Sequence, residues 1–259
     1  MPKTLTLAFD AGIATITLSR PEKRNAISSQ MIDELLAALD EIETGTARVA
    51  IITGAGKAFC AGMDLEALSA LAAFSHEQNL EDSRRMARLF RRLYFFPKPL
   101  IAAVNGAAIA GGTGIATMCD FTLAVPEAKF GYTEVKIGFI PALVSVFLRR
   151  QIGEKRARDL LLTGRIFDAT EAREFGLVTQ IVPAEMLLSR ARELATSLLS
   201  ASPTSLIRTK LLLRRCVEVE IDREIELAVQ ENAAIRSTPD FKEGLAAFLE
   251  KRPPKWSGQ

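Results

Sequence analysis

The feature that most constrains this chain is an uncharged run of twenty residues at positions 100–119, LIAAVNGAAIAGGTGIATMC. A run of this length could cross a bilayer, but four glycines and Asn105 interrupt it. Each glycine inside a helix costs about 1 kcal/mol, so a lipid-facing helix is disfavoured. The pattern instead predicts a buried strand, LIAAV, followed by a glycine-rich turn and the start of a helix.

Composition narrows the class of protein. The chain has 259 residues, 48% of them hydrophobic, and a net charge of +2, which gives no reason to expect nucleic acid or an anionic membrane as a partner. Its three cysteines lack metal-ligand spacing, and the first residues lack a signal-peptide pattern, so we expect reduced thiols and a cytoplasmic location. The single histidine, His76, lies in a polar stretch, so neither a metal site nor histidine-based catalysis is expected.

Hydrophobic periodicity predicts an α/β protein. Expected strands lie at residues 5–9, 13–18, 48–53, 100–104, 121–125, 165–167 and 178–182, and helical patterns alternate with most of them. A polar, mobile segment is expected around residues 70–80. Strand signals end at Ala184, and three helical stretches follow. We therefore predict an α/β core at residues 1–190 and a helical region at residues 191–259.

The glycine run permits two functional interpretations. Residues 112–117, GTGIAT, with Glu134 twenty positions after Gly114, partly match a dinucleotide-binding fingerprint but lack its third glycine. Alternatively, the backbone N–H groups at the start of the helix could form an oxyanion hole, which needs a second donor. Residues 54–68 offer one, because they also run from a strand through small residues into a helix near Asp64. The glycines could also serve backbone geometry alone.

Together these segments are similar to a known family. GKAFCAGMDL, AAVNGAAIAGGTGIATMCD and AKFGYTEVKIGFIPA occur in the order and spacing of the crotonase family, also called the enoyl-CoA hydratase/isomerase family. LSRPEKRNAIS resembles its early coenzyme A loop, and FKEGLAAFLEKRPPKW resembles its C-terminal helix. The resemblance covers essentially the whole chain. It implies a spiral of ββα units with a helical C-terminal trimerisation region, assembled as a homotrimer or a dimer of trimers.

The resemblance also implies a site for an acyl-CoA thioester, with coenzyme A bound as part of the substrate and no separate cofactor. The backbone N–H groups of Met63 and Gly111 would form the oxyanion hole, and Glu134 would be the acid/base. The implied coenzyme A contacts are Lys23, Arg24, Ala26, Ala61, Asp64 and Leu65, with Phe248 and Lys251 reaching the nucleotide of a neighbouring subunit. Simpler roles compete: a solvated turn for Lys23 and Arg24, helix packing for Phe248, and a helix cap for Asp64.

One departure from the family pattern bears on the reaction. Family hydratases commonly hold water between two glutamates, and the first of these positions is Gly114 here, where an added side chain is expected to project towards Glu134. A lone glutamate suits double-bond isomerisation, which we favour slightly over hydration by a single-glutamate hydro-lyase. A coenzyme A-binding scaffold without catalysis is a further alternative. Glu134 could be partly desolvated, which would raise its pKa, or it could pair with Lys136 or Lys129.

Overall fold

The computed structural model describes residues 3–258, and in it the uncharged run forms three separate elements. They are β5 (Leu100–Val104), β6 (Ala107–Ile109) and α4 (Gly111–Thr117). The predicted strand and helix are confirmed, whereas the short strand between them was not predicted. Within residues 3–258, no helix combines the length and the apolar character that crossing a membrane requires.

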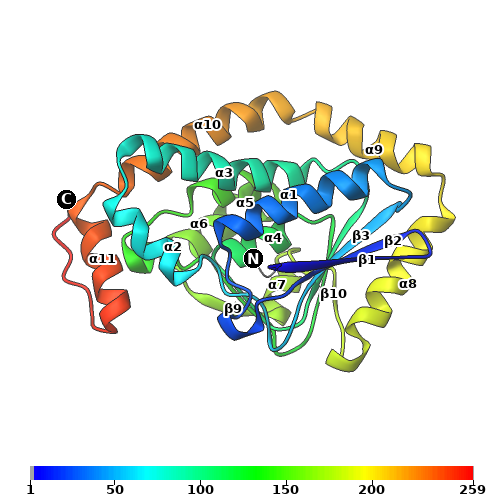
Figure 1. Ribbon diagram of the computed structural model, residues 1–259, viewed down its shortest axis with the longest axis horizontal. Coiled ribbons are helices and arrows are strands. Elements are labelled where there is room, and N and C mark those ends of the chain that lie inside the picture. The colour runs from blue at the N-terminus through cyan, green and yellow to red at the C-terminus, as the bar shows by residue number, and fades with distance from the viewer. Residues whose placement is uncertain (1–2, 259) are drawn as a thin grey trace.

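The larger of two sheets has the strand order β1-β2-β3-β5-β7-β10 (Figure 1). Its other strands are β1 (Leu5–Asp10), β2 (Ile13–Leu18), β3 (Val49–Gly54), β7 (Phe121–Ala124) and β10 (Gln180–Ile181). β1 and β2 form the predicted antiparallel hairpin, and all later neighbours pair in parallel. Every residue of β5 is buried, as expected for a parallel strand covered on both faces.

The smaller sheet was only partly foreseen, because its β9 matches the strand expected at residues 165–167 but its other three strands were not predicted. Its order is β4-β6-β8-β9, with β4 at Ala58–Cys60, β8 at Lys129–Gly131 and β9 at Ile166–Asp168. β4, β6 and β8 follow β3, β5 and β7 along the chain, so each unit gives one strand to each sheet. β4 pairs in parallel with β6, and β6 pairs in parallel with β8. This arrangement is the spiral of ββα units that the family resemblance implied.

Helices surround the sheets. They are α1 (Ser29–Thr44), α2 (Leu65–Ala70), α3 (His76–Tyr94), α5 (Ala142–Ile152), α6 (Glu154–Thr163), α7 (Ala169–Glu174), α8 (Leu187–Ser200), α9 (Pro203–Arg215), α10 (Glu218–Ile235) and α11 (Pro239–Glu250).

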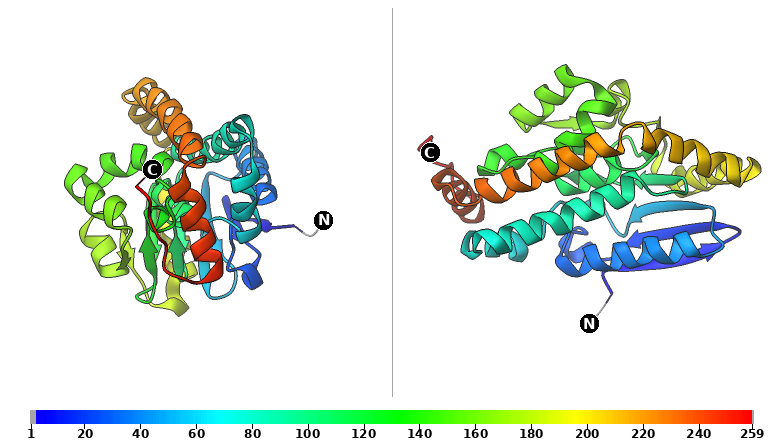
Figure 2. Two further views of the ribbon diagram at one scale, coloured as in Figure 1. Left: turned by 90° about the vertical axis from the view of Figure 1, so that its left-hand side faces the viewer. Right: turned by 90° about the horizontal axis from the view of Figure 1, so that it is seen from above.

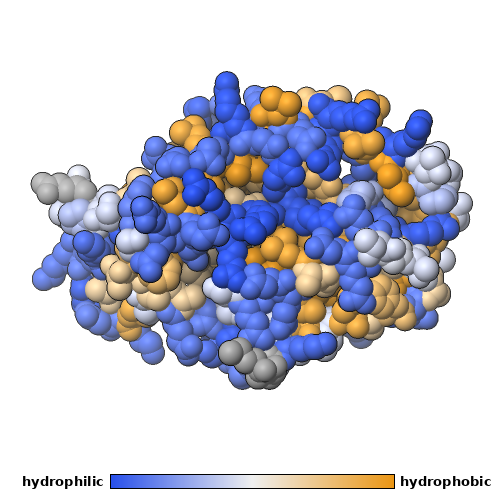
Figure 3. Space-filling model, turned by 45° about the horizontal axis from the view of Figure 1, so that its top comes forward, coloured by the Kyte–Doolittle hydropathy of each residue, from blue (hydrophilic) through white to orange (hydrophobic). Residues whose placement is uncertain are grey.

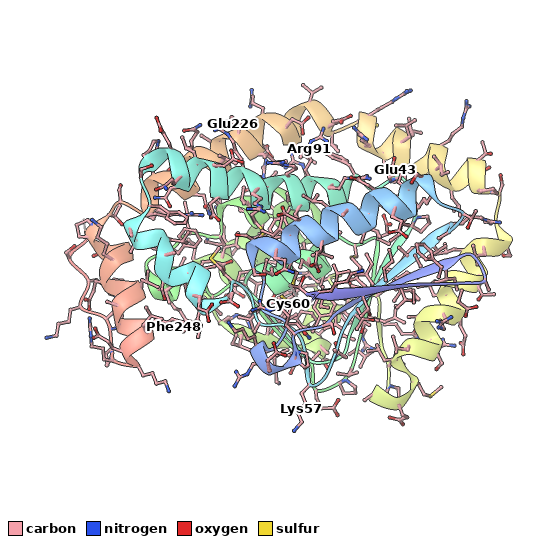
Figure 4. All side chains as sticks on the ribbon, viewed as in Figure 1. Glu43, Lys57, Cys60, Arg91, Glu226 and Phe248 are labelled. Atoms are coloured by element: carbon pink, nitrogen blue, oxygen red, sulfur yellow. The ribbon has the colours of Figure 1, made fainter. Side chains whose placement is uncertain are left out.

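The segment around residues 70–80, which was expected to be mobile, contains a short 3-10 turn and the first turn of α3. A capping box formed by Ser75 and Gln78 begins this helix. α3 and α10 lie side by side (Figure 2). Arg91 of α3 joins them through Asp222, 2.6 Å away (Figure 4).

The described residues after Ala184, up to residue 258, form four α-helices rather than three. The expected boundary after residue 190 falls inside α8, whose Leu187, Ala191 and Ala195 are buried and whose neighbours include β3 and β5. α8 therefore belongs structurally to the core, and the outer helices begin with α9. α11 returns to pack beside the 3-10 turn at Glu134–Ile137 (Figure 1).

Candidate active site

The backbone at Met63 presents a free N–H group because of how its neighbours are paired. Ile27 donates its N–H to the Gly62 carbonyl at 2.7 Å, and Asp64 donates to the Ile27 carbonyl at 2.9 Å. In this parallel bridge the N–H of Met63 points to the opposite side. No residue within 3–258 accepts a hydrogen bond from it. Gly62, at φ +91°, supplies the left-handed turn that aims Met63 this way.

Gly111 presents the second N–H group at the start of α4. It is the first helical residue, so it has no intrahelical acceptor, and none of the described residues outside the helix accepts from it. The preceding Ala110 has φ +49° and ψ −118°, a strained conformation for a residue with a Cβ. Two bonds to the Gly131 carbonyl hold this turn, from the Ala110 N–H at 2.7 Å and from the Thr113 hydroxyl at 3.0 Å.

The two donors lie at one edge of the smaller sheet. Met63 follows β4 and Gly111 follows β6, and parallel neighbours end at the same edge. The turns are also in close contact: a Cβ at Gly112 would lie 2.1 Å from the Cys60 carbonyl oxygen, so only glycine permits this approach. Two backbone N–H groups without acceptors in the described part of the chain thus lie at the same sheet edge and line the same cavity.

A buried ion pair fixes the Met63 turn to the early loop. The Asp64 carboxylate accepts from Arg20 at 2.7 Å and from the Glu66 N–H at 3.0 Å. Arg20 also donates to the Ala26 carbonyl at 2.8 Å. The helix-capping role of Asp64 is thus confirmed, and its charge is balanced by Arg20.

Glu134 is half-buried as a residue, and one oxygen of its carboxylate has no partner. Its Oε2 atom is inaccessible to solvent and has no hydrogen-bond partner in the described part of the chain. Neither Lys136 nor Lys129 forms an ion pair with it, so the salt-bridge alternative is wrong. Burial raises the pKa of Glu134 to about 7, and a hydrogen bond from its own backbone N–H only partly offsets this effect. Such a carboxyl is suited to accepting and returning a proton near neutral pH.

All the residues predicted for the site line one cavity of about 760 Å³. They are Lys23, Arg24, Ala26, Ala61, Met63, Asp64, Leu65, Gly111, Glu134, Phe248 and Lys251. Phe248 of α11 and Lys251 just after it line this cavity within the single chain (Phe248 is labelled in Figure 4), and their expected contact with the nucleotide of a neighbouring subunit stays a prediction. Lys23 is held by Glu66 at 2.7 Å, but among the described residues Arg24 and Lys251 have no ionic partner and remain available for phosphates.

The expected path from Gly114 to Glu134 is blocked, which corrects the sequence prediction. A Cβ at Gly114 would lie 2.5 Å from Cζ of Phe90, a buried residue of α3 that lines the cavity. The ring of Phe90 therefore occupies the direction in which an added side chain would project. Sequence patterns could not reveal this, because Phe90 reads as an ordinary core residue of an amphipathic helix.

Other cavity residues also escaped prediction. Asp82 from α3, Asn232 from α10 and Arg236 just after α10 line the same cavity, and Asn232 and Arg236 are buried. Each belongs to a helical pattern in which charged and polar residues usually face solvent. Their distance in sequence, about 150 residues between the two helices, leaves no local signal.

Comparison with known proteins agrees with this geometry. The Enoyl-CoA hydratase/isomerase sequence profile matches residues 8–259. A Thermus thermophilus protein with a provisional enoyl-CoA hydratase name is 47% identical, over 94% of this chain and 97% of its own. Escherichia coli 2,3-dehydroadipyl-CoA hydratase is 35% identical over 95% and 96%.

Solved structures lead to the same conclusion. An enoyl-CoA hydratase from Mycobacterium avium superposes with a TM-score of 0.88 at 33% identity, covering 99% of this chain and 100% of its own. The fold is thus of the crotonase type, as expected. The conserved architecture, the two free N–H groups and the buried carboxylate occur together in a chain whose sequence matches the family over nearly its whole length. The protein is therefore an enzyme of the enoyl-CoA hydratase/isomerase family.

Proposed function

We propose that this enzyme binds an acyl-CoA thioester with its carbonyl oxygen between the N–H groups of Met63 and Gly111, and that Glu134 moves a proton at C2. Coenzyme A enters as part of the substrate, and no metal or separate cofactor takes part. The observation that carries the proposal is an unpartnered buried carboxylate facing the same cavity as two unpartnered backbone donors.

The favoured reaction is migration of a double bond from C3 to C2. The Glu134 carboxylate accepts a proton from C2, and the C–H electrons move to form a dienolate whose negative charge rests on the thioester oxygen. Each backbone donor to such an oxygen contributes about 3–4 kcal/mol to lowering the barrier. Protonated Glu134 then returns the proton to C4, so the reaction consumes neither water nor a net proton.

The surroundings of Glu134 favour isomerisation over hydration. Hydration requires a water molecule to be oriented as well as deprotonated, and in family hydratases a second glutamate shares that task. Here the ring of Phe90 covers Gly114 at that position. Hydration by Glu134 alone is the second candidate, because the relatives are named as hydratases. A non-catalytic scaffold would have no need for a carboxylate held unpaired at a cost in stability.

The first prediction concerns Glu134→Gln. Turnover should fall about 10²–10⁴-fold, while the affinity for an acyl-CoA changes by no more than a few-fold. In the parent enzyme kcat/KM should rise with pH through about 7, because the ionised carboxylate is the base that accepts the C2 proton. Steady-state rates and calorimetric binding across pH 5–9 measure both effects. A variant with near-parent rates would place the chemistry on another residue.

Stability supplies an independent check on the same variant. The pKa of Glu134 rises from 4.5 to about 7 on folding, so the folded protein holds the proton more tightly than the unfolded chain. The free energy of unfolding of the parent should therefore fall by about 3 kcal/mol as pH rises from 4.5 to 7. The Glu134→Gln variant should lack this loss and be the more stable protein at pH 8. Parallel pH profiles from denaturant titration would contradict the burial of an ionisable Glu134.

The second prediction tests the role of Phe90. Gly114→Glu alone should lower the melting temperature, because its Cβ meets the Phe90 ring. Phe90→Ala combined with Gly114→Glu gives the new carboxylate room, and hydration of a 2-enoyl-CoA should increase relative to Phe90→Ala alone. Paired assays with 2-enoyl and 3-enoyl substrates measure the ratio. A parent enzyme that hydrates faster than it isomerises would overturn the isomerase assignment.

The third prediction concerns assembly, which we propose to be a trimer or a dimer of trimers. α9 and α10 expose large apolar side chains, among them Leu212 at 63%, Leu213 at 64% and Leu227 at 64%. Apolar patches also interrupt the hydrophilic surface in Figure 3. Such faces are usually covered by another subunit. Sedimentation should show a trimer or hexamer, and Leu213→Asp should weaken it.

The matched control for assembly is Leu162→Asp. Leu162 is 74% exposed but belongs to α6, away from the apolar faces of α9 and α10. This change should leave the trimer intact. A parent protein that sediments as a monomer at micromolar concentration would refute the proposed assembly.

A further inference from the structure

A stripe of α3 leads from the proposed reaction centre to a polar end of the cavity. Asp82, Met86 and Phe90 line the cavity at intervals of four residues, so they share one face of the helix. Phe90 packs beside Gly114, one turn after the Gly111 donor. Asp82 lies eight residues before Phe90, about 12 Å along the helix axis. The acyl chain of a bound thioester would extend along this stripe.

The polar end is built around Arg236, which is only 3% exposed. Its Nη1 donates to Asp82 Oδ2 at 2.7 Å and to Asn79 Oδ1 at 3.1 Å, and its Nη2 donates to Asn232 Oδ1 at 2.8 Å. The guanidinium also lies over the ring of Phe139, 5.3 Å from its centre. These contacts brace α3 against the end of α10.

The contacts between α3 and α10 leave two hydrogen-bond donors of Arg236 and Asn232 unpaired. The buried Nε of Arg236 has no acceptor in the described part of the chain. Asn232 Oδ1 accepts from both Arg236 and the Ser83 hydroxyl, at 2.8 and 3.1 Å, but its Nδ2 donates to none of the residues within 3–258. Nε is withdrawn from water, whereas Nδ2 is not among the buried unpaired atoms and remains accessible beside the cavity. An unpaired donor on a cavity wall points to an acceptor supplied by the ligand.

Charge balance selects the kind of acceptor. The positive charge of Arg236 is already compensated by Asp82 within the cluster. A carboxylate on the ligand would bring an uncompensated negative charge against a mostly apolar cavity wall, whereas a carbonyl or hydroxyl oxygen would accept from the free donors without that cost.

We propose that the cluster of Asp82, Asn232 and Arg236 is a subsite for a neutral oxygen near the far end of the acyl chain. This inference rests on the proposed function, in that the ligand is an acyl-CoA. The length of about 12 Å corresponds to roughly ten single bonds of an extended chain. The preferred substrates are therefore medium-length acyl-CoA thioesters that carry a carbonyl or hydroxyl group close to the end.

Calorimetric binding of three saturated thioesters to the full-length protein tests the subsite without any catalytic step. The ligands are decanoyl-CoA, 9-oxodecanoyl-CoA and the mono-CoA thioester of decanedioic acid. We expect the oxo ligand to bind about tenfold more tightly than decanoyl-CoA, and the diacid to bind more weakly than the oxo ligand. Equal affinities for the oxo and plain ligands, or tightest binding of the diacid, would overturn the subsite. Failure of all three to bind would instead refute the proposed function.

Two conservative variants test whether this cluster causes the preference for the oxo ligand. Asn232→Asp retains an oxygen that accepts from Arg236 and Ser83 but removes the free Nδ2 donor, and Arg236→Lys retains the charge opposite Asp82 but removes Nε. Each should reduce the preference for the oxo ligand about threefold while decanoyl-CoA affinity changes less than twofold. Arg84→Lys is the matched control, because Arg84 joins the same two helices through Glu226 at 3.6 Å on the exposed side.

The control should keep the parental preference. An unchanged preference in both cluster variants would show that the cluster is only a brace between helices. Melting curves identify any variant that fails to fold, and in that case the comparison of the three ligands on the parent protein still decides between the two outcomes.

Discussion

The parallel pairing of β4 with β6 is the constraint on which the proposed site depends. Each strand is only three residues long, yet their pairing brings two turns from different units of the spiral to one sheet edge. In the proposed function, Met63 and Gly111 would then present their N–H groups to the same oxygen. Each turn alone would be an ordinary strand-to-helix connection. The glycines in the uncharged run serve this contact, since a side chain at Gly112 would collide with the backbone at Cys60.

Two features of the site destabilise the folded protein, and the surrounding contacts show how they are maintained. Ala110 is kept in a conformation that costs of order 1–3 kcal/mol, and Glu134 is kept without a partner. Thr113 ties the first turn to Gly131, and the pair of Arg20 and Asp64 ties the second turn to the early loop. Strain and an unpaired carboxylate therefore persist because rigid neighbours leave them no alternative arrangement.

Features that depend on local sequence signals could be predicted, whereas features that depend on contacts between residues far apart in the chain could not. β3 and β5 were foreseen because they are continuous apolar runs, and the cap at Asp64 because its signal is local. The site residues were found through family resemblance. β4 and β6 were missed because a strand of three residues is too short to show periodicity. The contact of Phe90 with Gly114 depends on tertiary packing that no local pattern encodes.

α3 connects the two questions that the family resemblance leaves open, which are the reaction and the substrate. Near its end, the ring of Phe90 covers Gly114, and in the proposed reaction Glu134 would therefore act without a second carboxylate. Two turns earlier, Asp82 holds Arg236 at the cavity wall. If both proposals hold, one helix would bear on both the reaction at C2 and the far end of the acyl chain. Because contacts to Asp222 and Arg236 brace α3 at both points, the spacing between them would be set by the helix, and the preferred chain length would follow from the scaffold rather than from a loop.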